Sequence, residues 1–312
     1  MLQTEFWAKF KESSGWRSNK YGQLYGLSRF LPLRKSILYF PEIPQDGRFS
    51  DVFKDIKGDS TPGRIFSRFE FLELWSPALA GRLVRLGLVK AFEDVQPEYR
   101  QWLLLDKSEQ ELLKGMKPKG RYNINLAKKH HLKIDWGITD QSVKILFELY
   151  DQTAKRANFR GRALAYFQLL AKTLADNQAG DIIIVSKDGQ PLAALLLSFY
   201  GGVCSYLYGG SGDDRNLMAP YLTHWEAIRE AKKRGLTVYD LLAIAPFPSS
   251  AKSHPHDGLT RFKTQFGGQS IRLLGSWDLV QSHFWYSLYK FVERRRRPAV
   301  QWKSINTTDD LY

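Results

Sequence analysis

The sequence predicts an α/β (α+β) fold with mixed, largely antiparallel sheets flanked by helices. Two apolar runs, 181–185 and 191–200, are separated by Asp188-Gly189, a pair typical of tight hairpins. A third apolar run, 203–208, continues this antiparallel meander. A long helix is then expected over 219–233, where apolar residues recur at helical spacing, and a further strand over 236–241.

Shorter elements are expected before the meander, and the first hundred residues are rich in aromatic residues and turn signals. In chain order these elements are a helix at 6–11 ending near Ser13, a buried strand at 36–40 stopped by Pro41 and Pro44, a helix within 47–63, a strand at 65–71, a strand at 102–106, a helix opened by a capping box at Ser108–Glu111, and helices at 140–157 and 164–175.

Composition restricts the class of protein. The chain has 312 residues, 43% of them hydrophobic, which is enough for one large or two medium globular domains. The formal net charge of +14 favours polyanionic partners such as nucleic acid, anionic lipid or a diphosphate. The single cysteine, Cys204, excludes an internal disulfide and makes a metal cluster improbable. We find neither an apolar run of membrane-spanning length nor a signal-peptide pattern, so the cytoplasm is the expected compartment.

Four motifs follow one another between residues 206 and 268. They are Tyr-Leu-Tyr-Gly-Gly-Ser at 206–211, the helix beginning Ala-Pro-Tyr-Leu at 219, Val-Tyr-Asp-Leu at 238–241, and Gly-Leu-Thr-Arg-Phe-Lys-Thr-Gln-Phe-Gly-Gly at 258–268. This order of strand, Gly-Ser loop, helix, strand ending in Asp and Phe-Lys segment resembles the Fem family of non-ribosomal aminoacyltransferases. The absence of a long heptad insertion is typical of the compact FemX type, which has no coiled-coil arm.

The resemblance implies two tandem GNAT-like acyltransferase domains, and the element order of 140–241 matches such a domain. The first domain, 1–98 with 277–312, would bind the muropeptide precursor, and the second, 99–276, the aminoacyl-tRNA. The implied reaction moves an amino acid from aminoacyl-tRNA to the side-chain amine of a peptidoglycan precursor, either lipid II or UDP-MurNAc-pentapeptide. It builds interpeptide bridges and needs no cofactor and no metal.

The resemblance also assigns candidate catalytic residues. Phe262 would stack or pack beside the tRNA acceptor end, and Lys263 would stabilise negative charge near the ester. Asp240, at the end of a predicted inner strand, is a candidate for proton handling, although it equally suits capping of backbone amides. Glu70 stands where the FemX pattern has an aspartate after Arg-Phe, so its carboxylate is retained but lengthened.

Substrate-binding residues are implied in the same way. Arg162 and Tyr166, spaced i,i+4, are expected on one helix face, where they would contact the sugar-diphosphate peptide. Lys11 would join Arg162 on the diphosphate, with Lys9 as the alternative after a small register shift. Two tyrosines are expected on one side of the sheet, one of them lining the pocket: Tyr206 and Tyr208. A basic helix is expected to face tRNA phosphates through Arg121, Asn123, Lys128 and Lys129.

Two other functions stay open. A CoA-dependent GNAT-type N-acyltransferase is disfavoured because the segment Arg215–Pro220 lacks the glycines that let backbone approach a pyrophosphate. A non-catalytic RNA- or membrane-binding protein on the same fold is the second alternative. The segment 276–298 interleaves aromatic residues with four arginines at 294–297, and both an anionic membrane surface and packing on the first domain suit it. The inner face of the plasma membrane is therefore a second expected location.

Overall fold

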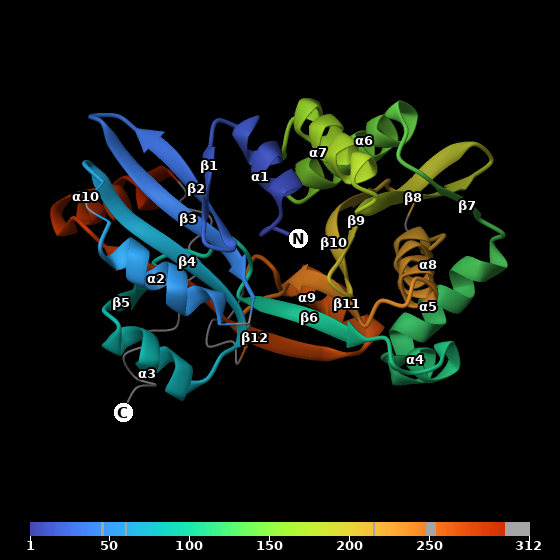
Figure 1. Cartoon of the computed structure of the whole chain (residues 1–312). Helices are drawn as coiled ribbons and strands as arrows, with labels where there is room; N and C mark the ends of the chain where they lie inside the picture. The colour runs from blue at the N-terminus through green and yellow to red at the C-terminus, as the bar shows by residue number, and fades with distance from the viewer. Residues whose placement is uncertain (45–46, 60, 215, 248–253, 297–312) are drawn as a thin grey trace. The chain divides into compact units, whose positions relative to one another are not determined.

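The computed structural model describes residues 1–44, 47–59, 61–214, 216–247 and 254–296. The chain divides into two compact units, which we call unit 1 (Met1–Glu98 with the residues from Arg272 on) and unit 2 (Tyr99–Ile271). Each unit has a mixed sheet with helices packed on it (Figure 1), so the predicted fold class is confirmed.

Unit 1 has a sheet in the order β1-β2-β3-β4-β12, with β5 also paired to β12. The pair β3–β4 is parallel and the other neighbours are antiparallel. β12 begins in the last residues of unit 2 and pairs with β4 from Leu273 on. The elements are α1 (Glu5–Glu12), β1 (Arg17–Tyr21), β2 (Leu24–Leu31), β3 (Lys35–Ile43), α2 (Arg48–Lys57), β4 (Arg64–Leu74), α3 (Pro77–Arg85), β5 (Leu88–Lys90), β12 (Gln269–Val280) and α10 (His283–Arg296).

Unit 2 has a sheet in the order β6-β11-β10-β9-β8-β7, in which only the described pair β10–β11 is parallel. Its elements are β6 (Tyr99–Leu104), α4 (Glu109–Gly115), α5 (Pro118–Lys129), β7 (Lys133–Trp136), α6 (Asp140–Arg156), α7 (Leu164–Asp176), β8 (Gly180–Lys187), β9 (Gln190–Tyr200), β10 (Val203–Ser211), α8 (Ala219–Lys233), β11 (Val238–Ala243), α9 (Asp257–Lys263) and the 3₁₀ turn η1 (Thr264–Phe266).

The two units share one order of elements. In each, a three-stranded antiparallel meander is followed by a helix and by a strand that returns parallel to the third strand: β1-β2-β3-α2-β4 in unit 1 and β8-β9-β10-α8-β11 in unit 2. This is the order of a GNAT-like domain, present twice. The sequence shows no repeat because this order depends on the spacing of apolar residues and turns rather than on residue identity.

Local signals in the sequence specify several elements well. Ser108 begins α4 with the predicted capping box. Its side chain accepts a hydrogen bond from the amide of Glu111, and the Glu111 carboxylate accepts one from the amide of Ser108. Asp188 and Gly189 form the predicted hairpin turn at φ values of 50° and 80°. The helix α8 occupies the predicted range, with Pro220 in its first turn and Gly235, at φ 74°, just beyond its end.

The expectation that Pro41 stops a strand is wrong, because β3 continues to Ile43. The register between β3 and β4 shifts between Phe40 and Ile43, and Glu42 takes a positive φ of 42°. The ladder is irregular at Pro41, so the missing amide hydrogen of proline is tolerated there.

The expectation of a Gly-Ser loop at 209–211 is also wrong, because these residues pair with β9 as part of β10. A Cβ atom at Gly210 would overlap the backbone of Leu149 and Tyr150 on α6. Glycine is therefore required there for close packing of a helix on a strand and not for a turn.

We expect Gly210→Ala to destabilise unit 2 by about 3 kcal/mol, because a methyl group would have to displace helix backbone rather than a flexible side chain. Denaturant unfolding followed by circular dichroism measures this. Gly115→Ala, at a helical position with open space around its Cα, is the matched control and should change the free energy of unfolding by less than about 1 kcal/mol. Equal stability of the two variants would contradict the packing argument.

Candidate active site

The parallel strands β10 and β11 of unit 2 are paired over a short stretch only. Their pairing runs from Val203 with Val238 to Ser205 with Asp240. Beyond this point β10 continues along β9 to Ser211, while Ala243 of β11 pairs with Arg100 of β6. The two strands therefore diverge from Asp240 on.

The side chain of Lys263 contacts both diverging strands. Its Nζ donates a hydrogen bond of 2.7 Å to the carbonyl oxygen of Ala243 on β11. The same atom lies 5.5 Å from the ring centroid of Tyr206 on β10, over the ring face. Lys263 is only 3% exposed. Burial lowers the pKa of Lys263 to about 7, although Asp240 acts in the opposite direction, and Arg100 lowers it further.

A cluster of aromatic rings surrounds this lysine on the side of α8. The ring of Phe262 packs against Tyr221, His224 and Phe266 at centroid distances of 5.1, 5.4 and 5.3 Å. Tyr206 meets the His224 ring edge-on at 4.7 Å. Phe262 is thus a packing residue that holds α9 against α8, and its neighbour Lys263 is the more buried of the two.

His224 is buried and neutral. Burial lowers the pKa of His224 to about 3, and the nearby Lys263 lowers it further. Its Nδ1 lies 2.8 Å from the hydroxyl of Tyr239, in a hydrogen bond. A neutral imidazole adds no second positive charge beside Lys263.

Asp240 lies inside β11, three residues before its end, and not at the predicted strand end. Its Oδ2 pairs with the Nη1 of Arg100 at 3.0 Å, with both side chains almost completely buried. Its Oδ1 accepts a hydrogen bond of 2.7 Å from the amide of Leu242, which has a φ of 55°. Asp240 therefore stabilises the backbone at the divergence point, which is the capping role that the sequence analysis held open.

A second group of predicted residues gathers against α6 and α7. The hydroxyl of Tyr208 donates to that of Tyr166 at 3.2 Å, and the guanidinium of Arg162 lies 5.2 Å from the ring centroid of Tyr166. Arg162 is exposed. The prediction that Arg162 and Tyr166 share a helix face is wrong, because α7 starts at Leu164 and Arg162 precedes it; the two side chains nevertheless meet.

The prediction that Tyr206 and Tyr208 face one side of the sheet is also wrong. The register between β10 and β9 shifts between these two tyrosines, so Leu207 is an extra residue in the strand. Such a bulge breaks the alternation of side chains. Tyr206 consequently contacts His224 of α8, whereas Tyr208 contacts Phe167 of α7 at 5.1 Å, and these helices lie on opposite faces of the sheet (Figure 1).

Two predicted residues belong to unit 1. Glu70 is 2% exposed and accepts hydrogen bonds from the Tyr39 hydroxyl at 2.5 Å, the Gln96 amide at 2.8 Å, the Ser276 hydroxyl at 3.2 Å and the Glu42 amide at 3.4 Å. Lys11 lies on α1, partly exposed, 5.2 Å from the ring centroid of Trp16. Lys9, the alternative to Lys11, pairs with Glu5 at 2.7 Å on the exposed side of the helix.

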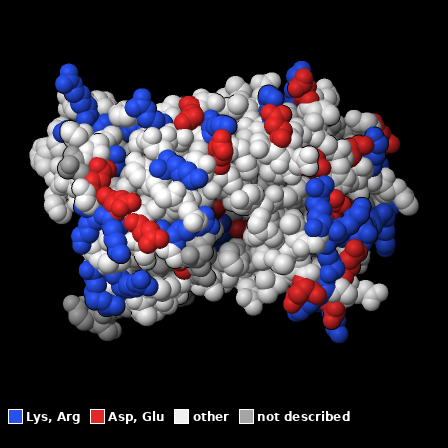
Figure 2. Space-filling view, viewed as in Figure 1, with Lys and Arg blue, Asp and Glu red and all other residues white. Residues whose placement is uncertain are grey.

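The predicted basic helix is α5, and Figure 2 shows lysine and arginine side chains gathered over it. Lys128 and Lys129 are exposed in its last turn, whereas Asn123 is buried. Arg121 donates hydrogen bonds to the carbonyls of Lys114 and Met116 at the end of α4, so it partly serves to join two helices.

Sequence reasoning missed two residues of the site. His224 lies on the apolar face of α8 defined by Tyr221, Trp225 and Ile228, and this spacing was available in the sequence. Arg100 had no such signal, since 140 residues separate it from Asp240.

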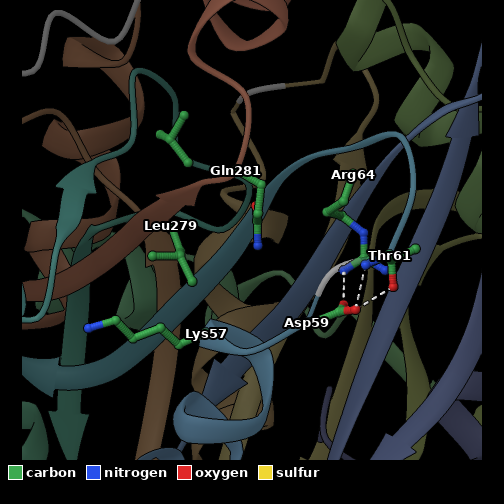
Figure 3. Close-up of a pocket in the computed structure, with 7 residues that line it drawn as sticks. Lys57, Asp59, Thr61, Arg64, Leu279 and Gln281 are labelled. Carbon is green, nitrogen blue, oxygen red and sulfur yellow. Dashed lines mark hydrogen bonds and ion pairs between the residues drawn. The ribbon is translucent and has the colours of Figure 1, made fainter.

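Unit 1 contains a cavity of about 420 Å³ at the start of β4 (Figure 3). Among the lining residues, Asp59 forms an ion pair with Arg64 at 3.3 Å and accepts hydrogen bonds from the amide and the hydroxyl of Thr61. The lining also includes Lys57, Leu279, Val280 and Gln281, none of which is a predicted site residue.

The fold and the site together define a tandem GNAT-like protein whose second unit holds a buried lysine between diverging strands. The sequence model of the FemAB family matches residues 86–185 and 176–294, and the chain belongs to this family. The crystal structure of FemX superposes with a TM-score of 0.79 at 19% identity, covering 92% of this chain and 94% of FemX. L-PGS from Bacillus licheniformis superposes at 0.57 with 10% identity, over 92% and 90%.

Among curated relatives, the lipid II:glycine glycyltransferase of Staphylococcus epidermidis is 22% identical over 275 residues. The enzyme of the same name from Staphylococcus aureus is 21% identical over 280 residues. Each match covers 68% of this chain but only 65% of the relative, so the chain spans about two thirds of these proteins.

We expect the Lys263 amine to titrate with a midpoint near 7 in an NMR pH series on lysine-labelled protein, assigned with Lys263→Arg. The ordinary lysine value is 10.5, so between about pH 7 and 10.5 the unfolded chain binds more protons than the folded one. The stability of the wild type relative to Lys263→Met should therefore rise with pH across this window. A midpoint near 10, or a stability difference independent of pH, would contradict the burial argument.

Proposed function

We propose that this protein is an aminoacyltransferase that moves an amino acid from aminoacyl-tRNA to the side-chain amine of a peptidoglycan precursor during interpeptide bridge formation. Lipid II and UDP-MurNAc-pentapeptide are the two candidate acceptors. The observation that carries the proposal is the buried Lys263 between diverging strands, with a pKa lowered to about 7. Membership of the FemAB family and the names of the staphylococcal relatives support it.

In this reaction the acceptor amine attacks the ester carbonyl of the aminoacyl-tRNA. A C–N bond forms, the C–O bond to the ribose breaks, the amine loses a proton and the ribose oxygen gains one. Negative charge develops first on the carbonyl oxygen and then on the departing ribose oxygen. A lysine with a pKa near 7 is present in both protonation states at neutral pH, so Lys263 suits stabilising this charge and returning a proton.

Seven of the predicted residues take binding roles in this proposal. Arg162, with Tyr166 and Tyr208 behind it, would bind the diphosphate of the precursor. Lys11 of unit 1 is a separate proposed precursor-binding cation. Unit 2 is the proposed tRNA and catalytic side, and unit 1 would bind other parts of the precursor. Arg121, Lys128 and Lys129 of α5 would contact tRNA phosphates.

A CoA-dependent reaction is less well supported. In that alternative a pyrophosphate would bind backbone amides at the start of the helix that corresponds to α8. Pro220 provides no amide hydrogen there, and the amides of Tyr221 and Leu222 donate to the carbonyl of Met218. Arg215, the cation of this segment, lies outside the described residues.

Lys263→Met should lower kcat by about 100-fold or more, because it removes the cation from the reacting ester. The assay combines a mixture of charged tRNAs with lipid II or UDP-MurNAc-pentapeptide and detects the aminoacylated precursor by mass spectrometry. Thermal unfolding of the same variant checks that the fold is intact. Turnover at the wild-type rate would remove Lys263 from the mechanism, and wild-type protein inactive with both precursors but active with an acyl-CoA would overturn the proposed function.

Arg162→Ala should raise KM for the precursor by about tenfold or more and change kcat little, because a charge-assisted contact to a phosphate is lost. Arg160→Ala is the matched control, an exposed arginine two residues earlier in the same loop, and should behave like the wild type. Steady-state kinetics with varied precursor measures both. Equal effects of the two substitutions would indicate general charge rather than a specific site.

Replacing Lys128 and Lys129 together by glutamine should weaken tRNA binding and reduce the slope of log affinity against log salt by about one to two. Lys144→Gln, an exposed helix lysine of α6, is the control and should leave the slope unchanged. Filter binding at several salt concentrations measures both. An unchanged slope in the double variant would exclude α5 from the tRNA contact.

A further inference from the structure

The turn between β2 and β3 exposes a large apolar side chain at its tip. The amide of Lys35 donates to the carbonyl of Pro32 at 3.3 Å, which makes Leu33 and Arg34 the central residues of the turn. Both have positive φ, 58° and 55°, a conformation that favours asparagine and glycine. Leu33 is nevertheless 73% exposed. The turn therefore carries a strained, solvent-facing leucine that neither core packing nor turn geometry explains.

The helix α10 exposes a continuous apolar stripe. Phe284, Leu288, Phe291 and Val292 are 72, 41, 52 and 37% exposed. Their spacing of four, three and one residues places them on one face of the helix. A stripe of two phenylalanines, a leucine and a valine is far more apolar than a solvated helix face requires.

The opposite face of α10 is firmly attached to unit 1. Tyr286 is buried, and its hydroxyl donates to Asp278 Oδ2 at 2.8 Å. Asp278 in turn pairs with Arg68 of β4 through Nε at 2.7 Å and Nη2 at 2.8 Å. The ring of Phe66 packs on Tyr286 and on Tyr289 at 5.3 and 5.2 Å. These contacts fix α10 on unit 1, so its exposed stripe belongs to a helix that is packed on the sheet.

Strand register brings the turn and the helix to one end of the sheet of unit 1. Ile37, just after the turn, pairs with Phe66 of β4, and Phe66 pairs with Val280, just before α10. Lys35 connects the two directly, with its Nζ 4.6 Å from the ring centroid of Trp285. Figure 1 shows the β2–β3 turn and α10 at the same end of unit 1.

Cations border these apolar side chains. Arg34 follows Leu33 at the tip, and Arg294 and Arg295 are exposed in the last turn of α10. The guanidinium of Arg295 lies 4.2 Å from the ring centroid of Phe291. Glu293 lies on the same helix, partly buried and beside Tyr289. Apolar side chains bordered by arginine and lysine suit the interface of a membrane that contains anionic lipid.

We propose that Leu33 and the stripe Phe284–Val292 form a surface that docks unit 1 on an anionic phospholipid membrane. The apolar side chains would enter the acyl boundary, while Arg34, Arg294 and Arg295 meet lipid phosphates. In the described part of the chain every helix falls short of the length and apolarity of a membrane crossing. This proposal identifies the surface that would hold the protein at the membrane location expected from the sequence. It does not depend on the transferase activity.

Cosedimentation with phosphatidylcholine vesicles, with and without phosphatidylglycerol and free of any peptidoglycan precursor, tests this surface. The wild type should bind the anionic vesicles, more weakly at high salt, and bind pure phosphatidylcholine little. Leu33→Asn with Arg34→Gly should lower the affinity about tenfold or more while keeping or raising the melting temperature, because these residues suit the turn. A purely structural turn would not show this opposite response.

Phe284→Ser with Phe291→Ser should also lower the affinity at least about tenfold. Val84→Ser is the control: it removes an apolar side chain that is 49% exposed on α3, outside the proposed surface, and should leave the affinity unchanged. The proposal is overturned if the wild type ignores anionic vesicles or if both double variants bind like the wild type. It is also overturned if the variants instead abolish self-association measured by analytical ultracentrifugation, which would assign the surface to a second copy of the chain. Because no precursor is present, neither result bears on the proposed reaction.

Discussion

The candidate active site depends on the point at which β10 and β11 stop pairing. Asp240 stands at this point and directs one carboxylate oxygen to Arg100 and the other to the amide of Leu242. These bonds guide β11 toward β6 and leave the carbonyl of Ala243 for the ammonium of Lys263. The buried ion pair between β6 and β11 thus sets where β11 leaves β10 and which carbonyl the lysine side chain meets there.

The environment of Lys263 is unfavourable for a positive charge, and this lowers its pKa into the range where it can exchange a proton at neutral pH. Burial disfavours the ammonium, the neutral His224 and the Tyr206 ring supply little compensation, and Arg100 opposes it, while Asp240 and one carbonyl support it. The two protonation states are therefore nearly balanced at neutral pH. A surface lysine would stay charged and would not exchange a proton in that range.

Local patterns in the sequence predicted most of the fold, because α8, the hairpin at Asp188 and the cap at Ser108 depend on neighbouring residues. The errors arose where a distant element decides the conformation. The bulge at Leu207 is visible only against β9, and the glycine at 210 is explained only by α6. Lys263 was predicted as a candidate through the motif that contains it, but its burial follows from packing of α9 on α8, which periodicity does not reveal.

The difference between the two units indicates why the chemistry is assigned to one of them. In unit 1 the strands β3 and β4 stay paired, with bulges, as far as Ile43 and Phe71. Glu70, one of its buried carboxylates, accepts the hydrogen bonds given above, and taking up a proton would turn an accepting oxygen into a donor and disrupt them. In unit 1 the shared fold instead carries the apolar helix α10, which is attached through Tyr286 and Asp278. Unit 2 uses the shared fold to separate two strands around one lysine, and the proposed reaction depends on this separation rather than on the fold itself.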